Sequence, residues 1–200
     1  MLLVIDSATA ACSVALLSDD GAILDERHAI VGRGHAERLL PMIEELLGSR
    51  RPDSILVDCG PGSFTGVRVG LAAAQGLGIG WGVPIAGYSS LALIAAASGE
   101  RDVAVALTGG HGELFVQSYG GDPIRALDDL RSLEPAAAAV SIHAELVLGS
   151  GAEALVAARR SGRWADALPR AADAWALPPA LRSLQPRPIY GRAPDAMPMK

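Results

Sequence analysis

The chain has little positive charge for its size. Of its 200 residues, 17 are basic and 22 acidic, which gives a formal net charge of −5, and the only lysine is the last residue. A free-standing nucleic-acid-binding protein needs a basic surface to hold phosphates, so the charge balance argues against that class. It leaves open a subunit of a complex in which a partner holds the nucleic acid.

Cysteine and metal-binding patterns are also scarce. Cys12 and Cys59 are far apart and form no CxxC pair, which excludes a disulfide framework and a cysteine zinc site. The expected state is two buried free thiols in a reducing cytosol. The histidines show neither HxxxH nor HExxH spacing, so we expect neither a metal nor a cofactor; they are His28, His35, His111 and His143.

Signals for secretion or membrane insertion are missing. The first residues lack a basic segment and read as a strand that ends at Asp6. The longest uncharged stretch, Val69–Gly99, is diluted by seven glycines, a proline and polar residues, so it does not read as a membrane span. We therefore expect a soluble cytoplasmic protein with no membrane contact.

The first hundred residues alternate between strand and helix patterns. Apolar runs bounded by turn residues predict strands, and apolar residues at helical spacing predict helices. Within the helix predicted over 34–48, Pro41 should cause a kink or a late start. Ser89 is the expected cap of the helix that follows it. The predicted strands are 2–6, 12–18, 22–30, 55–59 and 84–87, and the other helices run from the loop after 59 to about 80 and over 89–97.

The second half is less regular. A hairpin is predicted over Val103–Leu107 and Leu114–Tyr119, followed by a short strand and a helix over 145–148 and 152–160. The Ala136–Ala139 run and the proline-rich end from Pro178 onward are expected to be irregular. By analogy of element order, the chain is an α/β protein of the actin-like, Hsp70-like (ribonuclease-H-like) class, a mixed sheet with flanking helices in two lobes. The expected division is an N-terminal lobe, 1–100, and a smaller C-terminal lobe, 101–200.

A glycine-rich loop at Gly60–Gly66 is the strongest local motif. The loop precedes a predicted helix, whose free N–H groups and N-cap hydroxyls attract anions. Arg68 in the first turn opposes the helix dipole, which indicates a nearby carboxylate or phosphate. No lysine follows the last glycine, so this is not a P-loop. A tight turn whose glycines serve packing is the alternative; the candidate anion-binding residues are Gly62, Ser63, Thr65 and Arg68.

The helix after this loop is rich in small residues at four-residue spacing. One series contains Gly66, Gly70, Ala74 and Gly78, and another contains Ala72, Gly76 and Gly80. Such spacing lets a neighbouring backbone approach closely. Glycine costs about 1 kcal/mol relative to alanine inside a helix, so this helix must be clamped between neighbours. Those neighbours are either internal or include a second chain.

Two enzyme classes remain as alternatives. Asp6 and Thr9 follow the first strand where actin-like ATPases grip phosphate, and Asp6 could hold magnesium or cap the turn, so a nucleotide-dependent phosphotransferase is one rival. A glycoprotease-type peptidase is the weaker one. Gly62–Gly66 is not a GxSxG nucleophile elbow, because Ser63 follows Gly62 directly and Gly66 lies three positions after it rather than two.

Four blocks of sequence resemble the bacterial TsaB (YeaZ) family. They are Leu3–Leu17, His35–Ile43, Gly60–Gly70 and Pro188–Arg192. The resemblance is dense over residues 2–99 and thin over 100–185, where the family's Asp-Ala-Arg segment is replaced by Leu107-Thr108-Gly109-Gly110-His111. It implies an actin-like fold and a non-catalytic role. In that role, the chain dimerises with TsaD and works beside the ATPase TsaE, while TsaD transfers a threonylcarbamoyl group to N6 of adenosine 37 in tRNAs that read codons beginning with A.

The resemblance also suggests where the partner docks. We expect no catalytic residue in this chain, contact with tRNA only through the complex, and a homodimer when TsaD is missing. The two small- or apolar-rich helices, 34–48 and 66–80, are the expected contact surfaces, and Ala74→Trp should weaken the complex without unfolding the chain. The predicted contact residues are Leu39, Leu40, Ile43, Leu47, Gly70, Ala73, Ala74 and Gly78.

Overall fold

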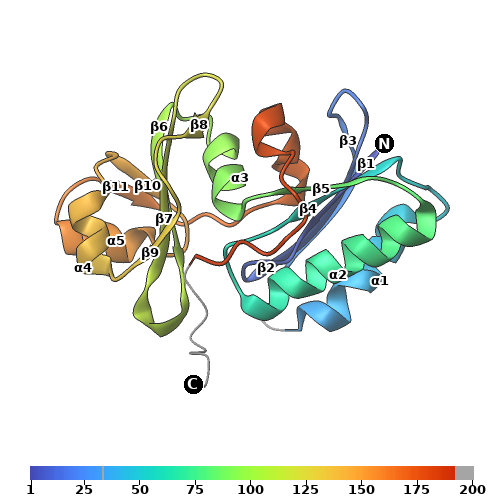
Figure 1. Ribbon diagram of the computed structural model, residues 1–200, viewed down its shortest axis with the longest axis horizontal. Helices are drawn as coiled ribbons and strands as arrows, with labels where there is room; N and C mark the ends of the chain where they lie inside the picture. The colour runs from blue at the N-terminus through green and yellow to red at the C-terminus, as the bar shows by residue number, and fades with distance from the viewer. Residues whose placement is uncertain (33, 192–200) are drawn as a thin grey trace, which may run out of the picture.

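The computed structural model describes residues 1–32 and 34–191, which form two lobes, each built around a β-sheet (Figure 1). The strand order of the first sheet is β3-β2-β1-β4-β5, where β1 pairs antiparallel with β2 and parallel with β4. This mixed sheet is the ribonuclease-H-like arrangement predicted from the sequence. Its strands are β1 (Leu2–Asp6), β2 (Ala11–Leu17), β3 (Ile23–Ile30), β4 (Ser54–Asp58) and β5 (Ile85–Tyr88).

The second sheet repeats the plan of the first, although the sequence shows no repeat. Its order is β11-β10-β6-β7-β8, with β9 also on β7, and β6 pairs antiparallel with β7 and parallel with β10. The predicted α/β class with two actin-like lobes is therefore confirmed. The strands are β6 (Asp102–Thr108), β7 (Leu114–Gly120), β8 (Arg125–Ala126), β9 (Arg131–Leu133), β10 (Leu146–Leu148) and β11 (Arg163–Ala165).

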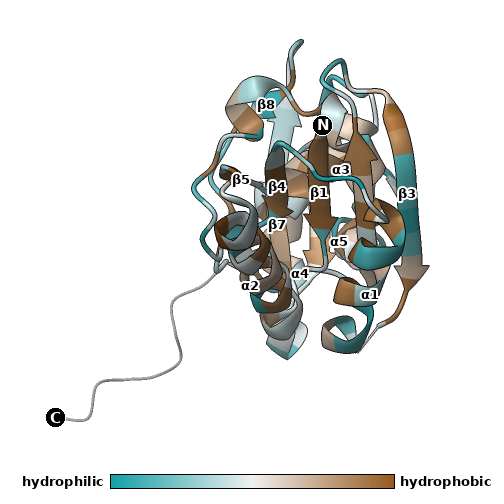
Figure 2. Ribbon diagram, turned by 90° about the vertical axis from the view of Figure 1, so that its right-hand side faces the viewer, coloured by the Kyte–Doolittle hydropathy of each residue, from teal (hydrophilic) through white to brown (hydrophobic). Residues whose placement is uncertain are grey.

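Helices separate and cover the sheets. Helices α1 (His35–Leu47) and α2 (Phe64–Trp81) cover one face of the first sheet, whose apolar central strands lie behind them in Figure 2. Helix α3 (Ser90–Ala97) and the 3₁₀ helix η2 (Ala171–Ala176) lie between the two sheets. The outer face of the second sheet is covered by α4 (Pro135–Ser141) and α5 (Ala152–Arg159), and the short 3₁₀ helices are η1 (Gly110–Gly112) and η3 (Pro179–Leu181).

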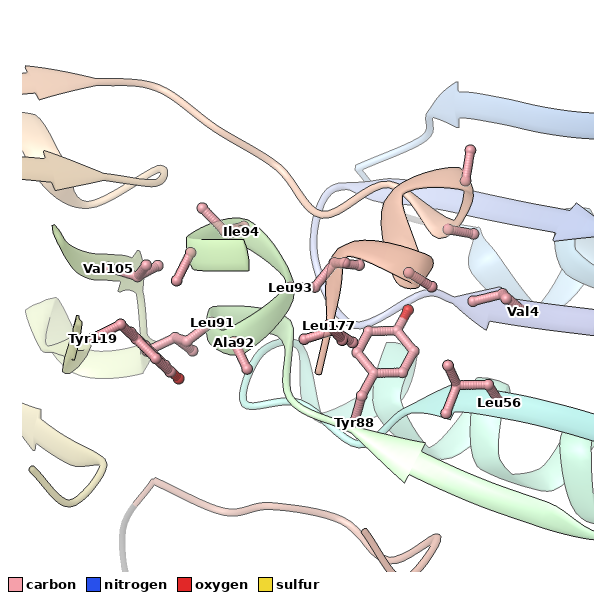
Figure 3. Close-up of a cluster of buried hydrophobic side chains, with 14 of the residues drawn as sticks. Val4, Leu56, Tyr88, Leu91, Ala92, Leu93, Ile94, Val105, Tyr119 and Leu177 are labelled. Atoms are coloured by element: carbon pink, nitrogen blue, oxygen red, sulfur yellow. The ribbon is translucent and has the colours of Figure 1, made fainter. Parts of the chain in front are cut away.

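A central core joins the lobes. Val4 and Tyr88 of the first sheet, Leu93 of α3 and Val105 and Tyr119 of the second sheet belong to one buried cluster (Figure 3). Burying each large apolar side chain stabilises the fold by roughly 1.5–3 kcal/mol. Helix α3 is apolar on all sides because it packs against both sheets, as expected for a buried helix.

Three local predictions need correction. Helix α1 begins at His35 and continues through Pro41, so a late start is wrong. Glu37 and Pro41 are both exposed, and water can replace the hydrogen bond that the proline ring cannot make. The alanine run expected to be irregular forms α4, because Pro135 suits the first helical position and alanine has the highest helix propensity. Ser89 precedes α3 as expected, but its side chain makes no capping hydrogen bond.

The C-terminal part of the chain returns to the first lobe. The amide of Ala171 donates to Ser13 Oγ at 3.0 Å, and Leu184 exchanges two backbone hydrogen bonds with Gly87 beside β5. The amide of Ile189 donates to the carbonyl of Cys59 at 2.8 Å. Residues 171–191, which follow the second sheet in the chain, thus contact the first lobe. Arg192, the last residue of the tail motif, lies outside the described residues.

Candidate functional site

The glycine-rich loop is packed directly on the turn after β1. A Cβ atom at Gly62 would lie 2.0 Å from the carbonyl oxygen of Ala8, and one at Gly66 would lie 2.0 Å from that of Ser7. Ser7 Oγ donates to the Gly66 carbonyl at 2.9 Å, and Ser63 Oγ caps α2 by accepting from the Gly66 amide at 3.3 Å. The glycines are therefore required by packing, which is the structural alternative left open by the sequence.

Arg68 contacts two aromatic side chains instead of the carboxylate or phosphate that its position suggests. Its guanidinium lies 3.6 Å from the centre of the Phe64 ring and donates to the Tyr190 hydroxyl at 3.2 and 3.3 Å. The Phe64 and Tyr190 ring centres are 6.0 Å apart. This contact joins the first turn of α2 to the C-terminal segment at an exposed position, where a cation–π pair contributes about 0.5–1 kcal/mol.

A cavity of about 940 Å³ lies between the lobes, at the N-terminus of α2. Three of the predicted anion-binding residues line it, namely Gly62, Ser63 and Arg68, whereas Thr65 is exposed on α2 and does not. The second lobe contributes Thr108, the last residue of β6, and the turn that follows it. The cavity therefore combines hydroxyl groups, helix N–H groups and aromatic rings, a lining suited to a small polar ligand. Other lining residues are Thr9, His111, Glu113, Phe115, Ser132 and Ser150.

Asp6 does not line this cavity. Its side chain is fully buried and accepts a hydrogen bond from the Tyr88 hydroxyl at 2.7 Å. Of the two roles considered for Asp6, holding magnesium and capping the turn, the first would require a carboxylate that faces the cavity, and this one does not. Asp58, at the end of β4, is buried beside it and is not among the site residues predicted from the sequence. A signal was present: Asp6 and Asp58 each end an apolar strand.

The two cysteines and His35 are buried away from the cavity. Cys12 and Cys59 are free and buried, and burial raises the pKa of each thiol to about 11. His35 is buried at the start of α1, where its Nε2 donates to the carbonyl of Thr9 at 2.8 Å. In residues 1–32 and 34–191, no cluster of three or more His, Cys, Asp or Glu side chains could hold a metal.

The small-residue series that starts at Gly66 faces the chain's own sheet. A Cβ at Gly70 would lie 2.6 Å from Ser7 Oγ, and one at Gly78 would lie 2.6 Å from the Ile85 side chain. Ala74 is fully buried. We call Gly66, Gly70, Ala74 and Gly78 the inner ridge of α2. Its residues are not free to meet a partner, so the predicted contacts at Gly70, Ala74 and Gly78 need correction, and Ala74→Trp would disturb this chain's own core.

The same correction applies to most of the predicted α1 contacts. Leu39, Ile43 and Leu47 are buried in the core between α1 and the first sheet. An amphipathic helix first buries its apolar stripe against its own sheet, which the sequence pattern alone does not distinguish from a partner surface. Leu40, in contrast, is 54% exposed, and Ala73 of α2 is half-buried.

The second series of small residues is open. Gly76 and Gly80 have no atom within 4 Å of the position of an added Cβ, and Ala72 is also exposed. We call Ala72, Gly76 and Gly80 the outer ridge of α2. Ile79, beside this ridge, is 84% exposed, the most exposed of the large apolar side chains described. Helix α1 packs against α2, and we call the outer ridge, Ile79 and the exposed Leu40 of α1 the open face.

The described residues include no helix that is both long enough and apolar enough to cross a bilayer. The uncharged Val69–Gly99 stretch forms most of α2, strand β5 and helix α3.

Comparisons by sequence find a family and named relatives. The model of the family described as "TsaD: tRNA N6-adenosine threonylcarbamoyltransferase" matches residues 28–165. The tRNA threonylcarbamoyladenosine biosynthesis protein TsaB of Escherichia coli K12 is 37% identical over 130 residues, 60% of this chain and 55% of that protein. The protein of the same name from Haemophilus influenzae is 36% identical over 135 residues, 62% of this chain and 56% of the relative. The chain thus matches little more than half the length of these curated relatives.

Comparison by structure covers nearly the whole chain. YeaZ from Pseudomonas aeruginosa superposes with a TM-score of 0.78 and 30% sequence identity, covering 94% of this chain and 98% of that one. A second structure from the same organism, described as similar to peptidase YEAZ, gives a TM-score of 0.79 at 30% identity and covers 96% of this chain and 99% of that one. The chain belongs to the TsaB (YeaZ) branch of the family that the TsaD model describes.

Proposed function

We propose that this chain is the partner subunit of a TsaD-type enzyme in the synthesis of threonylcarbamoyladenosine in tRNA. In this proposal TsaD transfers the threonylcarbamoyl group to N6 of adenosine 37, TsaE is the associated ATPase, and the chain contributes no catalytic residue. The names of the E. coli and H. influenzae relatives support the pathway. The observation that carries the docking role is the open face, where small residues and two exposed apolar side chains meet solvent.

The chemistry of the open face suits a helix of a partner. At Gly76 and Gly80 the absence of side chains lets another backbone come close to α2. Leu40 and Ile79 are the apolar anchors that such a contact would bury. About 800 Å² on each side suffices for a specific interface. The chain would act by binding the active conformation of TsaD better than the inactive one, because only a difference in affinity shifts an equilibrium.

A steric substitution on the outer ridge tests this proposal. Gly76→Trp places a large ring where the partner helix would lie, and replacing a helical glycine should not destabilise the chain itself. We expect the variant to lose copurification with TsaD and TsaE and to fail to restore tRNA modification in an assay reconstituted with and without this chain. Ala158→Trp is the matched control, since it changes an exposed alanine on α5 of the other lobe.

Either of two results would contradict the docking role. One is full modification with Gly76→Trp at a subunit concentration at which the unmodified chain is limiting. The other is equal loss with Ala158→Trp. Sedimentation of the chain alone tests whether the open face also forms a homodimer, which Gly76→Trp should then dissociate.

A second candidate function rests on the cavity between the lobes. Its volume of about 940 Å³ and its hydroxyl groups from both lobes would accommodate a nucleotide, as a phosphotransferase requires. Titration of the isolated chain with ATP separates the two candidates. Micromolar binding with turnover favours the phosphotransferase, and absence of turnover with intact support of TsaD favours the partner subunit.

A further inference from the structure

Two aspartates lie side by side beneath the glycine-rich loop. Strands β1 and β4 are parallel neighbours with Ile5 opposite Val57, so Asp6 and Asp58, the next residue of each strand, come together at the sheet's end. Neighbouring strands are about 4.8 Å apart. Both side chains are buried, with exposed fractions of 0% and 1%. Two carboxyl groups thus occupy one site that water does not reach.

The hydrogen bonds around the pair leave one carboxylate oxygen of Asp6 without a donor of ordinary geometry. Asp6 Oδ2 accepts from the Tyr88 hydroxyl at 2.7 Å; Asp58 Oδ1 accepts from the Gly60 amide at 2.8 Å and Asp58 Oδ2 from the Ser90 hydroxyl at 2.7 Å. Asp6 Oδ1 is buried and accepts no hydrogen bond of ordinary geometry. The Asp6 and Asp58 side chains are within hydrogen-bonding reach of each other, and two ionised carboxylates cannot bond.

The surroundings favour the protonated form. Burial, followed by the Asp58 charge, raises the pKa of Asp6 well above its usual range, although the Tyr88 hydroxyl and the backbone amide of Ala8 oppose the rise. Burial likewise raises the pKa of Asp58 to about 6, although the hydrogen bonds from Ser90 and Gly60 oppose the rise. The titratable groups facing the pair are Tyr88 on β5, Cys12 on β2 and Cys59 after β4. All three are neutral at pH 7, because the pKa of each is itself raised.

We propose that Asp6 and Asp58 share one proton at neutral pH, donated by Asp6, and that this proton holds the glycine-rich loop and the start of α3 against the first sheet. Asp58 anchors both elements, since it binds Gly60, the first residue of the loop, and Ser90, the first residue of α3. Ser90 Oγ also contacts the Pro61 carbonyl at 3.2 Å. Loss of the proton leaves two adjacent buried anions, and hydrating them requires the loop and α3 to move.

The sign of the pH dependence follows from the raised pKa values. A carboxyl group with a raised folded-state pKa binds its proton in the native state while the unfolded chain has already lost it. Stability therefore falls as pH rises from about 4, and each extra bound proton changes the unfolding equilibrium constant by about tenfold per pH unit. The two carboxyl groups titrate as a coupled pair. Below about pH 6 the native state holds two more protons than the unfolded chain, and above it one more.

Urea unfolding of the full chain between pH 6.5 and 8.5 tests the shared proton. In Asp6→Asn the amide donates permanently to Asp58, so no proton is needed. We expect the unmodified chain to lose about tenfold in its folding equilibrium constant per pH unit, and Asp6→Asn to lose this slope and become the more stable protein at pH 8.5. Asp102→Asn, an exposed change at the start of β6, should keep the slope. An Asp6→Asn variant that keeps the slope, or is less stable by the same amount at every pH, overturns the proposal.

Two further measurements test the proposal. The first uses the unmodified chain and so does not depend on the folding of a variant, and the second follows the movement of the loop and α3. A ¹³C NMR titration of the unmodified chain should show the Asp6 carboxyl still protonated at pH 7; ionisation of both carboxyls below pH 5 overturns the proposal. Amide hydrogen exchange, corrected for its intrinsic pH dependence, should show the 60–66 loop and Ser90 losing protection between pH 6.5 and 8.5 in the unmodified chain and not in Asp6→Asn. If the two proteins show equal amide protection while the unmodified chain still loses stability as the pH rises, the proton does not hold the loop and α3 in place, and the proposal is refuted.

Discussion

At the scale of single residues, the same amino acid has opposite roles along α2. Gly66 faces the Ser7 carbonyl so closely that no side chain fits, whereas Gly76 faces open space. Each belongs to a series of small residues spaced by four, so the sequence pattern alone does not distinguish the buried glycine from the exposed one. The contact that separates them comes from a residue almost sixty positions earlier, so local sequence reasoning could not assign it.

Substituting alanine at these two glycines should give opposite results. Gly66→Ala forces a Cβ into a rigid backbone oxygen and should destabilise the chain by about 3 kcal/mol, the upper end of the usual cost of overpacking. Gly76→Ala should stabilise it by up to about 1 kcal/mol through helix propensity. Urea denaturation at pH 7 measures both. Equal destabilisation by the two changes would contradict the assignment of inner and outer ridges.

At the scale of elements, sequence periodicity predicts α1, α2 and the five strands of the first sheet well, because each signal is local and several residues long. It fails where the partner is distant or the element is short. Strands β8, β9 and β11 have two or three residues and no readable period. The contact of Arg68 with Tyr190 spans 122 positions, and the pairing of Asp6 with Asp58 depends on strand order.

Adjacent leucines on α1 provide a test of which face the helix buries. Leu39 is fully buried, so Leu39→Ala should leave a cavity and cost about 2–5 kcal/mol. Leu40 is 54% exposed, so Leu40→Ala should change the free energy of unfolding by less than about 0.5 kcal/mol. Chemical denaturation of both variants checks the difference. If Leu40→Ala were as costly as Leu39→Ala, the open face would not be open in solution.

At the scale of the whole molecule, the two lobes share their largest core. Residues of both sheets and of α3 belong to one buried cluster, and residues 171–191 bind back to the first lobe after the second is complete. The two-lobe class was predictable from element order in the first hundred residues. The return of the C-terminal segment was not, because its few buried apolar residues show no regular period and its hydrogen bonds join positions far apart in the sequence.

A shared core predicts that the lobes unfold together. Variants that retain only Trp81, on α2, or only Trp164, on β11, report on one lobe each. We expect their fluorescence transitions in urea to coincide with each other and with far-UV circular dichroism. Leu93→Ala, in the buried helix between the sheets, should lower both midpoints equally. Separate midpoints for the two tryptophans would show that the lobes are independent folding units.

The two ridges of α2 also bear on how such a chain tolerates change over time. Residues on the inner ridge are constrained by folding. Residues two positions away, on the outer ridge, are constrained under the proposed function by association with the partner. A lineage that abandoned the partner would keep the inner ridge small while larger side chains accumulated on the outer one. One helix would then record separately whether its protein still folds in this way and whether it still assembles.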